Sequence, residues 1–185
     1  MRIISIISKL FTFFNTLLLK KKFKKFGKGS RIKWGSRILN PHNIEIGDNV
    51  LIEELAWLNA GHKDCLLKIS DGVHIGRLVH INCYNNVFIG KNVLIGPNVF
   101  IGDSDHSNSE LNKEIIFQKV KIKNKIRVGE GSFIAKDVNI LSGCDIGKNT
   151  VVSSNAVIQN CKINDFSLVV GSLATIKQGY YLGNK

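Results

Sequence analysis

One histidine of the chain lies in a polar segment whose composition suits acid–base chemistry. His106 belongs to the sequence Gly-Asp-Ser-Asp-His-Ser-Asn-Ser-Glu at residues 102–110, which also contains Asp103, Asp105 and Glu110. A neutral imidazole can accept a proton near neutral pH, and a neighbouring carboxylate or a backbone carbonyl can orient its ring. Taken alone, a loop histidine is more often simply solvated, so a catalytic role for His106 depends on the structure that carries it.

The other histidines and the cysteines form no recognisable metal or disulfide motif. No two cysteines have the Cys-x-x-Cys spacing. We therefore expect no bound metal and no disulfide bonds, and this cysteine usage is typical of a reducing cytoplasm. His80 directly precedes an aliphatic position of the repeat described below, so its side chain is expected to point outwards. The remaining members of the two sets are His42, His62, His74, Cys65, Cys83, Cys144 and Cys161.

An aliphatic residue recurs every six positions over most of the chain. A helix repeats about every 3.6 residues and a strand about every two, so a period of six indicates a solenoid of short strands joined by corners. A second series of smaller residues runs two positions earlier, from Val120 to Ala156, and the same period occupies residues 44–101 with interruptions. Glycine often follows the aliphatic residue, and asparagine lies two positions further on, as expected at sharp corners. The uninterrupted aliphatic series is Ile122, Val128, Ile134, Ile140, Ile146, Val152 and Ile158.

The repeat units resemble those of a known family. Ile-Gly-Lys-Asn-Val-Leu at 89–94 and Ile-Gly-Pro-Asn-Val-Phe at 95–100 are similar to the hexapeptide repeats of left-handed β-helix acyltransferases. The similarity is above all to the bacterial O-acetyltransferases of maltose, xenobiotic and surface-polysaccharide type. It implies an all-β solenoid, a left-handed parallel β-helix of hexapeptide repeats with about five coils. We expect this domain at residues 27–177 with one extruded loop at 102–119, followed by a C-terminal tail at 178–185.

In this family an extruded loop carries the catalytic histidine, and the run from Val87 to His106 resembles the stretch that ends in it. The resemblance implies that His106 is the general base, which removes the proton of a sugar hydroxyl as this attacks the thioester of acetyl-coenzyme A. Acetyl-coenzyme A is expected as co-substrate in a cleft between neighbouring subunits, with direct transfer in a ternary complex. By position in the family pattern, the coenzyme contacts are expected from Ala135, Lys136, Ser153 and Ser154 to the pantetheine and from Lys162 to the phosphates.

The sequence departs from the family pattern at several positions near these contacts. Phe133 stands where tryptophan is frequent, and Ala135 replaces a frequent glycine. Because only the backbone of that corner is expected to meet the coenzyme, an alanine is compatible with the contact. The stretch 165–177 resembles the family ending, with Leu173 where proline is common.

The N-terminal segment, residues 1–26, combines a predicted amphipathic helix with a basic cluster. Apolar residues between Ile3 and Leu18 share one side of the helix, and polar residues such as Thr12 and Thr16 share the other. The formal net charge is +12, which favours an anionic partner. The helix can lie on an anionic membrane surface, or it can cover the first coil with its apolar side, and both interpretations stay open. The basic cluster comprises Lys20, Lys21, Lys22, Lys24, Lys25, Lys28, Arg31 and Lys33.

Together these patterns predict an acetyl-coenzyme A-dependent O-acetyltransferase that modifies a sugar in bacterial surface-polysaccharide biosynthesis, on a glycan that is lipid-linked or free. The resemblance also implies a homotrimer. A free sugar or an antibiotic is the alternative acceptor, and a γ-type carbonic anhydrase or a non-catalytic scaffold is the alternative class. The histidine pair typical of such an anhydrase is absent, since Leu111 lies five residues after His106. We expect a cytoplasmic protein, held at the inner face of the cytoplasmic membrane if its N-terminal helix binds lipid, and no nucleic-acid partner, because no base-reading motif occurs.

Overall fold

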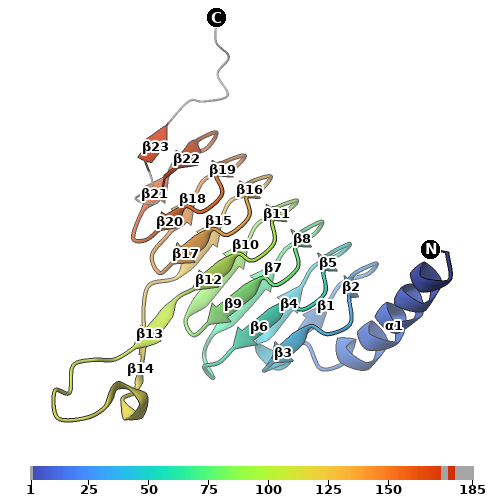
Figure 1. Ribbon diagram of the computed structural model, residues 1–185, viewed down its shortest axis with the longest axis horizontal. Coiled ribbons are helices and arrows are strands. Elements are labelled where there is room, and N and C mark those ends of the chain that lie inside the picture. Colours follow the sequence, from blue (N-terminus) through green and yellow to red (C-terminus); the bar gives the residue numbers. More distant parts are fainter. Residues whose placement is uncertain (1, 172–174, 178–185) are drawn as a thin grey trace, which may run out of the picture.

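The computed structural model describes residues 2–171 and 175–177, and it shows one helix followed by a parallel β-solenoid (Figure 1). Short strands stack into three parallel sheets, named here sheets A, B and C, and the chain visits them in turn on each coil. The solenoid expected from the six-residue period is therefore confirmed. The expected tail at 178–185 and the unusual Leu173 lie outside the described residues.

The strands are short, mostly two to four residues, and their bounds define the coils. Sheet A consists of β1 (Lys25–Phe26), β4 (Ile44–Ile46), β7 (Leu66–Ile69), β10 (Asn86–Ile89), β15 (Ile126–Val128), β18 (Asp145–Ile146) and β21 (Lys162–Ile163). Sheet B consists of β2 (Arg31–Ile32), β5 (Leu51–Ile52), β8 (His74–Ile75), β11 (Leu94–Ile95), β16 (Phe133–Ile134), β19 (Val151–Val152), β22 (Leu168–Val170) and the antiparallel β23 (Thr175–Lys177). Sheet C consists of β3 (Arg37–Leu39), β6 (Trp57–Ala60), β9 (His80–Cys83), β12 (Phe100–Gly102), β17 (Asn139–Leu141) and β20 (Val157–Ile158). Outside the sheets lie the hairpin of β13 (Ser104–His106) and β14 (Val120–Ile122) and the 3-10 helices η1 (Pro41–Asn43) and η2 (Ile115–Phe117).

The solenoid has about seven coils rather than the five expected, because sheet A alone holds seven parallel strands. The additional coils lie at its two ends. In the first coil, the inward residues Phe26, Ile32 and Ile38 are separated by lysines and arginines, which obscured the period. In the last coil, Ile163 follows Ile158 after five residues instead of six, yet it is 2% exposed.

The aliphatic series fills the axis of the solenoid. Val128, Ile134, Ile140, Ile146 and Val152 are each 0% exposed, as the six-residue period predicted. Each residue stacks in register on its counterpart in the next coil, as Ile134 does on Val152. Because each buried aliphatic side chain stabilises the fold by ~1.5–3 kcal/mol, this axial core dominates the stability of the solenoid.

Two members of the series do not belong to the core, and the prediction for them was wrong. Val120 and Ile122 are 39% and 42% exposed, because β14 pairs antiparallel with β13 outside the solenoid. The extruded segment is therefore a hairpin that reaches residue 122, beyond the loop expected at 102–119, and the repeat resumes at Ile126. Spacing alone does not reveal this, because a hairpin strand can keep the same aliphatic period.

At several corners, asparagine adopts the left-handed backbone conformation that the sequence analysis expected from glycine. Asn49, Asn92 and Asn98 adopt the left-handed region with φ of 54°, 54° and 57°, which asparagine tolerates better than most residues. Gly96, which follows an aliphatic residue, does not have a positive φ. Instead, a Cβ added there would lie 2.9 Å from the backbone nitrogen of Lys136 on the next coil. This glycine is required by the close approach of two coils rather than by the turn itself.

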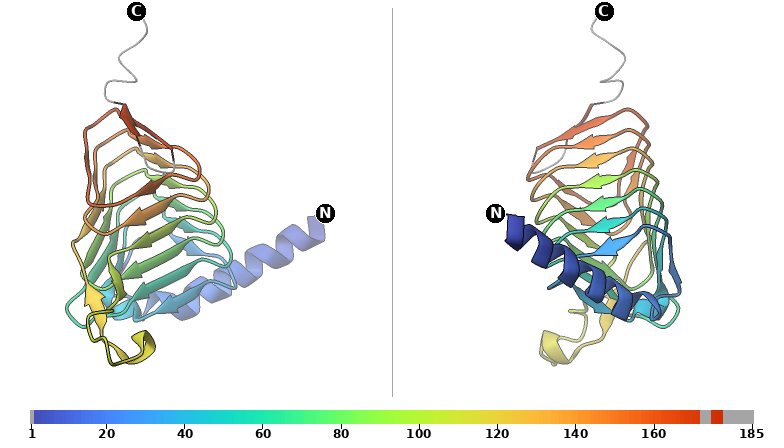
Figure 2. Two further views of the ribbon diagram at one scale, coloured as in Figure 1. Left: turned by 60° about the vertical axis from the view of Figure 1, so that its left-hand side comes forward. Right: turned by 90° about the vertical axis from the view of Figure 1, so that its right-hand side faces the viewer.

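The helix α1 (Arg2–Lys20) crosses the first coil and projects beyond it (Figure 2). Its polar side, not its apolar side, faces the solenoid. The Thr16 hydroxyl accepts the N–H of Ile32 at 3.0 Å, and the Asn15 amide donates to the carbonyls of Ile32 and Lys33 at 3.1 and 3.2 Å. These bonds satisfy the otherwise open edge of sheet B at β2, and Leu19 and Phe23 close the end of the core. The interpretation of α1 as a cap with an inward apolar face is therefore wrong.

Candidate active site

His106 lies on the hairpin that leaves the solenoid between sheet C and sheet A (Figure 1). It ends β13 and pairs with Val120 of β14, and its side chain is exposed. The tip of the hairpin is a folded turn, because the buried Gln118 amide donates to the carbonyls of Glu110 and Lys113 at 2.9 and 2.7 Å. The polar break therefore carries its histidine on a defined arm rather than on an irregular loop.

The three carboxylates near His106 have different environments. Asp103 is 0% exposed, and its two oxygens accept the backbone N–H groups of Tyr84 and Asn85 at 2.6 and 2.9 Å. Burial raises the pKa of Asp103, although these N–H donors act in the opposite direction. Asp103 thus anchors the base of the hairpin to the corner that precedes β10.

Asp105 and Glu110 serve the local structure of the hairpin. The Asp105 carboxylate accepts the backbone N–H of His106 at 2.9 Å and pairs with Lys123 at 3.0 Å, and the Lys123 contact lowers the pKa of Asp105. Glu110 lies 3.5 Å from Lys113 at the exposed tip. Within residues 2–171, none of the three carboxylates is hydrogen-bonded to the His106 ring.

Two side-chain ladders on the outer face of sheet C lead to the hairpin, and sequence reasoning missed both. In the polar ladder, the Asn59 amide donates to Asn82 at 2.8 Å, and the Asn82 amide donates to the Ser104 hydroxyl at 3.2 Å. Asn82 therefore ties sheet C directly to the first residue of β13. Predicting this ladder requires knowing which residues of neighbouring coils stack on each other. The spacing of the inward residues does not give that register, because the coils differ in length.

The second ladder on sheet C is aromatic. The rings of Trp57 and His80 stack with centroids 4.3 Å apart, and Phe100 meets His80 edge-on at 5.3 Å. The Arg37 guanidinium lies 5.0 Å from the centre of the Trp57 ring. His80 points outwards, as predicted, and its partial burial lowers its pKa. A half-buried imidazole next to flat rings forms an amphipathic surface beside the hairpin.

The structure brings four of the five expected coenzyme contacts together. Ala135 and Lys136 form the corner between β16 and β17, and Ser153 and Ser154 form the same corner one coil later. The two corners are joined by backbone hydrogen bonds, in which Ala135 donates to Val152 and Asn155 donates to Lys136. The Lys136 side chain is exposed and pairs with Asp137 at 3.2 Å.

Lys162, expected to contact the coenzyme's phosphates rather than the pantetheine, lies apart from these four residues. It lies on β21 of sheet A, opposite Asp145 of β18, whereas the other four lie at the corner between sheets B and C.

His106 and the four corner residues occupy different corners of the solenoid. The hairpin leaves at the corner between sheets C and A, while Ala135, Lys136, Ser153 and Ser154 lie at the corner between sheets B and C. Sheet C therefore separates the two groups within one chain. No cluster of three or more histidine, cysteine, aspartate or glutamate side chains suited to a metal ion occurs within the described part of the chain.

The repeats and the fold define the chain as a hexapeptide-repeat β-helix. Residues 125–160 match a family model described as bacterial transferase hexapeptide (six repeats). A probable acetyltransferase of Mycobacterium tuberculosis, Rv3034c, is 32% identical over 160 residues, which cover 76% of this chain and 53% of the relative. The chain thus spans about half the length of that curated relative.

Several solved structures share the fold. AntD, an N-acyltransferase from Bacillus cereus in complex with dTDP and 3-hydroxybutyryl-CoA, has a TM-score of 0.74 and 19% identity, covering 88% of this chain and 86% of AntD. PerB from Caulobacter crescentus, in complex with CoA and GDP-perosamine, has a TM-score of 0.60 and 18% identity, covering 82% and 58%. The hexapeptide-repeat acetyltransferase VCA0836 from Vibrio cholerae, complexed with acetyl-coenzyme A, has a TM-score of 0.54 and 20% identity, covering 88% and 74%. At these identities the likeness concerns the fold.

Proposed function

We propose that the protein is an acyl-coenzyme A-dependent acetyltransferase that acts on a sugar hydroxyl, with His106 as the general base. The observation that carries this proposal is the position of His106, exposed on an anchored hairpin that interrupts a hexapeptide solenoid. The resemblance of Rv3034c, described as a probable acetyltransferase, supports the reaction class. The complexes of AntD and VCA0836 with coenzyme A derivatives support the choice of acyl donor.

In the proposed reaction, the His106 imidazole takes the proton of the acceptor hydroxyl as its oxygen attacks the thioester carbonyl carbon. The carbon–sulfur bond then breaks, and the imidazolium returns its proton to the leaving thiolate. The products are a sugar acetate and coenzyme A, so atoms and charge balance without a covalent enzyme intermediate. General-base catalysis contributes ~10²–10⁴ in rate, and the remainder comes from holding both substrates together.

In this proposal, two neighbouring copies of the chain form each active site together, one with His106 and the other with the four corner residues. Because sheet C separates His106 from the corner of Ala135 and Ser153, one chain alone does not form the site. The hairpin tip also presents apolar side chains that a neighbour would cover: Leu111, Ile115, Ile116 and Phe117 are 95%, 54%, 77% and 68% exposed. A homotrimer, with one active site in each cleft between solenoids, accommodates both observations.

The acceptor class is the open part of the proposal, and two candidates have specific support. We favour a hydroxyl of a glycan in bacterial surface-polysaccharide biosynthesis, because the basic amphipathic segment at residues 1–26 would hold the enzyme at a membrane that carries lipid-linked glycans. An amino group on a nucleotide-linked sugar is the second candidate, because AntD is an N-acyltransferase and a mutant of it was crystallised with dTDP-4-amino-4,6-dideoxyglucose and coenzyme A. The products differ chemically, since an acetate ester is cleaved by hydroxylamine and an amide is not.

The test is acetyl transfer from labelled acetyl-coenzyme A to a panel of hydroxyl and amino sugars. His106→Ala should lower turnover by at least about a hundredfold while coenzyme A binding, measured by calorimetry, stays within about threefold. His74→Ala, which removes a histidine from β8 of sheet B, serves as the matched control and should retain full turnover. Near-normal transfer by His106→Ala would remove His106 from the role of base. Absence of transfer to every acceptor, together with absence of coenzyme binding, would refute the activity itself.

A further inference from the structure

The outer side of α1 is an apolar surface that the solenoid does not use. In a helix on the surface of a globular protein, the apolar side usually faces the core. In α1 the aromatic and aliphatic side chains of residues 7–18 are between 42% and 73% exposed. These side chains, named here the outer face, are Ile7, Leu10, Phe11, Phe13, Phe14, Leu17 and Leu18.

The outer face is exposed because the opposite side of α1 has a structural task. Thr12 is 8% exposed, and Asn15 and Thr16 bond the backbone of β2. Turning α1 to bury its apolar residues would break these bonds and leave the edge of sheet B without partners. The exposure of the outer face is therefore a consequence of how the helix is attached. A contiguous apolar surface of this kind marks an interaction site.

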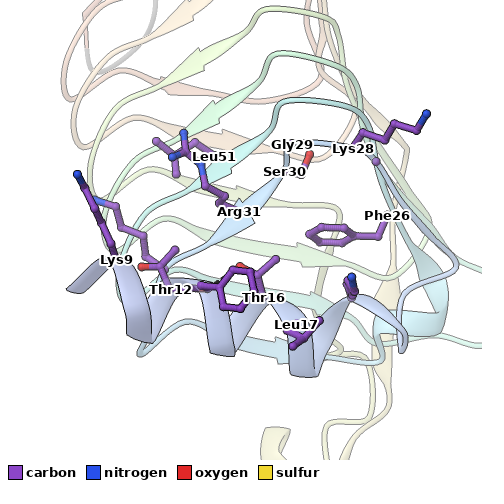
Figure 3. A pocket seen from close by; sticks show the side chains of 14 residues that line it. Lys9, Thr12, Thr16, Leu17, Phe26, Lys28, Gly29, Ser30, Arg31 and Leu51 are labelled. Carbon is purple, nitrogen blue, oxygen red and sulfur yellow. Dashed lines mark hydrogen bonds between the residues drawn. The ribbon is translucent and has the colours of Figure 1, made fainter. Parts of the chain in front are cut away.

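A basic cleft borders the outer face. It lies between α1 and the first coil, with a volume of about 780 Å³, and Figure 3 shows Lys9 and Thr16 on its helical side and Arg31 and Lys28 on its strand side. Phe13 and Leu17 belong both to the cleft and to the outer face. The cations of the cleft are Lys9, Lys20, Lys28, Arg31 and Lys33.

The carboxylates around the cleft compensate only part of this charge. Lys33 pairs with Glu53 and, at 3.1 Å, with Glu54, and the Asp48 carboxylate accepts the backbone N–H of Lys28 at 2.7 Å. Within the described residues, Lys9, Lys20 and Arg31 form no ion pair. The cleft is thus a cationic strip along the border of an apolar surface, which suits phosphate-bearing amphiphiles.

We infer that α1 docks the protein on the surface of an anionic lipid bilayer, with the outer face among the acyl chains and the basic cleft at the level of the phosphates. An interfacial helix combines these two features, and α1 contains no acidic residue in its first turn. A second copy of the chain fits the surface less well, because it would bring two lysine clusters of a chain with net charge +12 together. No described helix is long and apolar enough to cross a membrane.

Co-sedimentation with vesicles tests this inference independently of any catalytic activity. The protein should bind vesicles that contain phosphatidylglycerol and should bind pure phosphatidylcholine at least about tenfold more weakly, with further weakening between roughly 0.1 M and 0.5 M salt. Phe14→Ser/Leu18→Ser should reduce binding to anionic vesicles by at least about tenfold, because two apolar side chains no longer enter the bilayer. Both side chains are more than half exposed, so the variant should keep its thermal unfolding transition.

Phe166→Ser is the control, since it removes an exposed apolar side chain from a corner of the last coil, away from α1 and from the hairpin. It should leave vesicle binding unchanged. Equal binding to neutral and anionic vesicles, or full binding by Phe14→Ser/Leu18→Ser, would overturn the inference. So would sedimentation velocity showing that the outer-face variant changes the assembly state while vesicle binding persists, because the outer face would then cover another copy of the chain.

Discussion

The Asp103 carboxylate holds the base of the hairpin that carries His106, and its removal should loosen this hairpin measurably. Asp103→Ala leaves the N–H groups of Tyr84 and Asn85 without their acceptor at a position where the carboxylate was 0% exposed. Each buried donor left without an acceptor costs ~1–3 kcal/mol, so two donors cost roughly 2–6 kcal/mol. Water that enters the space reduces this cost, and we therefore expect a loss of at least about 2 kcal/mol in the free energy of unfolding.

Urea unfolding measures the global loss, and amide hydrogen exchange at Tyr84 and Asn85 measures the local one. Asp105→Ala is the control in the same hairpin, because its carboxylate is exposed and pairs with Lys123; it should cost less than about 1 kcal/mol. Asp103→Ala should also lower acetyl transfer through the displaced imidazole while coenzyme binding persists. If the two variants unfold at the same urea concentration, with unchanged exchange at Tyr84 and Asn85, the anchoring role of Asp103 is refuted.

Two further predictions concern stability. Leu78 has a φ of 58° and is 51% exposed, so Leu78→Asn should relieve part of a conformational cost of ~1–2 kcal/mol and raise Tm by about 2–4 °C. The control Leu94→Asn, at an ordinary strand position, should give no such gain. An equal rise in Tm for both variants would contradict the backbone argument. Because burial raises the pKa of Asp103 in the folded state, its contribution to stability is complete below the unfolded pKa of about 3.9 and declines as the pH rises through the folded pKa. The wild-type advantage over Asp103→Asn in urea unfolding should therefore shrink above pH ~4, and a growing advantage would show that the N–H donors outweigh the burial.

The axial core was predictable because one physical requirement repeats along the chain. Each coil must return an aliphatic side chain to the same axis, so the positions of Ile134, Ile140 and Ile146 follow from spacing alone. The hairpin was predictable for the complementary reason, since its polar residues cannot occupy that axis. What spacing did not reveal is the fate of Val120 and Ile122, which keep the period but pair with β13 instead of with a neighbouring coil.

The features that the sequence did not reveal depend on the register between neighbouring coils and on the open edge of sheet B at β2. The ladder from Asn59 through Asn82 to Ser104 needs coils of unequal length to stack in a particular register. For α1, the sequence pattern shows that one side is apolar and the other polar, but it does not show which side packs against the solenoid. That choice is made by the backbone groups of β2, which need the hydroxyl of Thr16 and the amide of Asn15.

In the proposed active site, an acyl-coenzyme A molecule meets His106 in a cleft between two copies of this chain. A crystal structure of the protein with coenzyme A bound tests it most directly. We expect the pantetheine along the corner of Ala135, Lys136, Ser153 and Ser154, with its sulfur close to the imidazole of His106 from a neighbouring chain. Coenzyme A bound away from that corner, or a His106 imidazole remote from the sulfur in every copy, would contradict it.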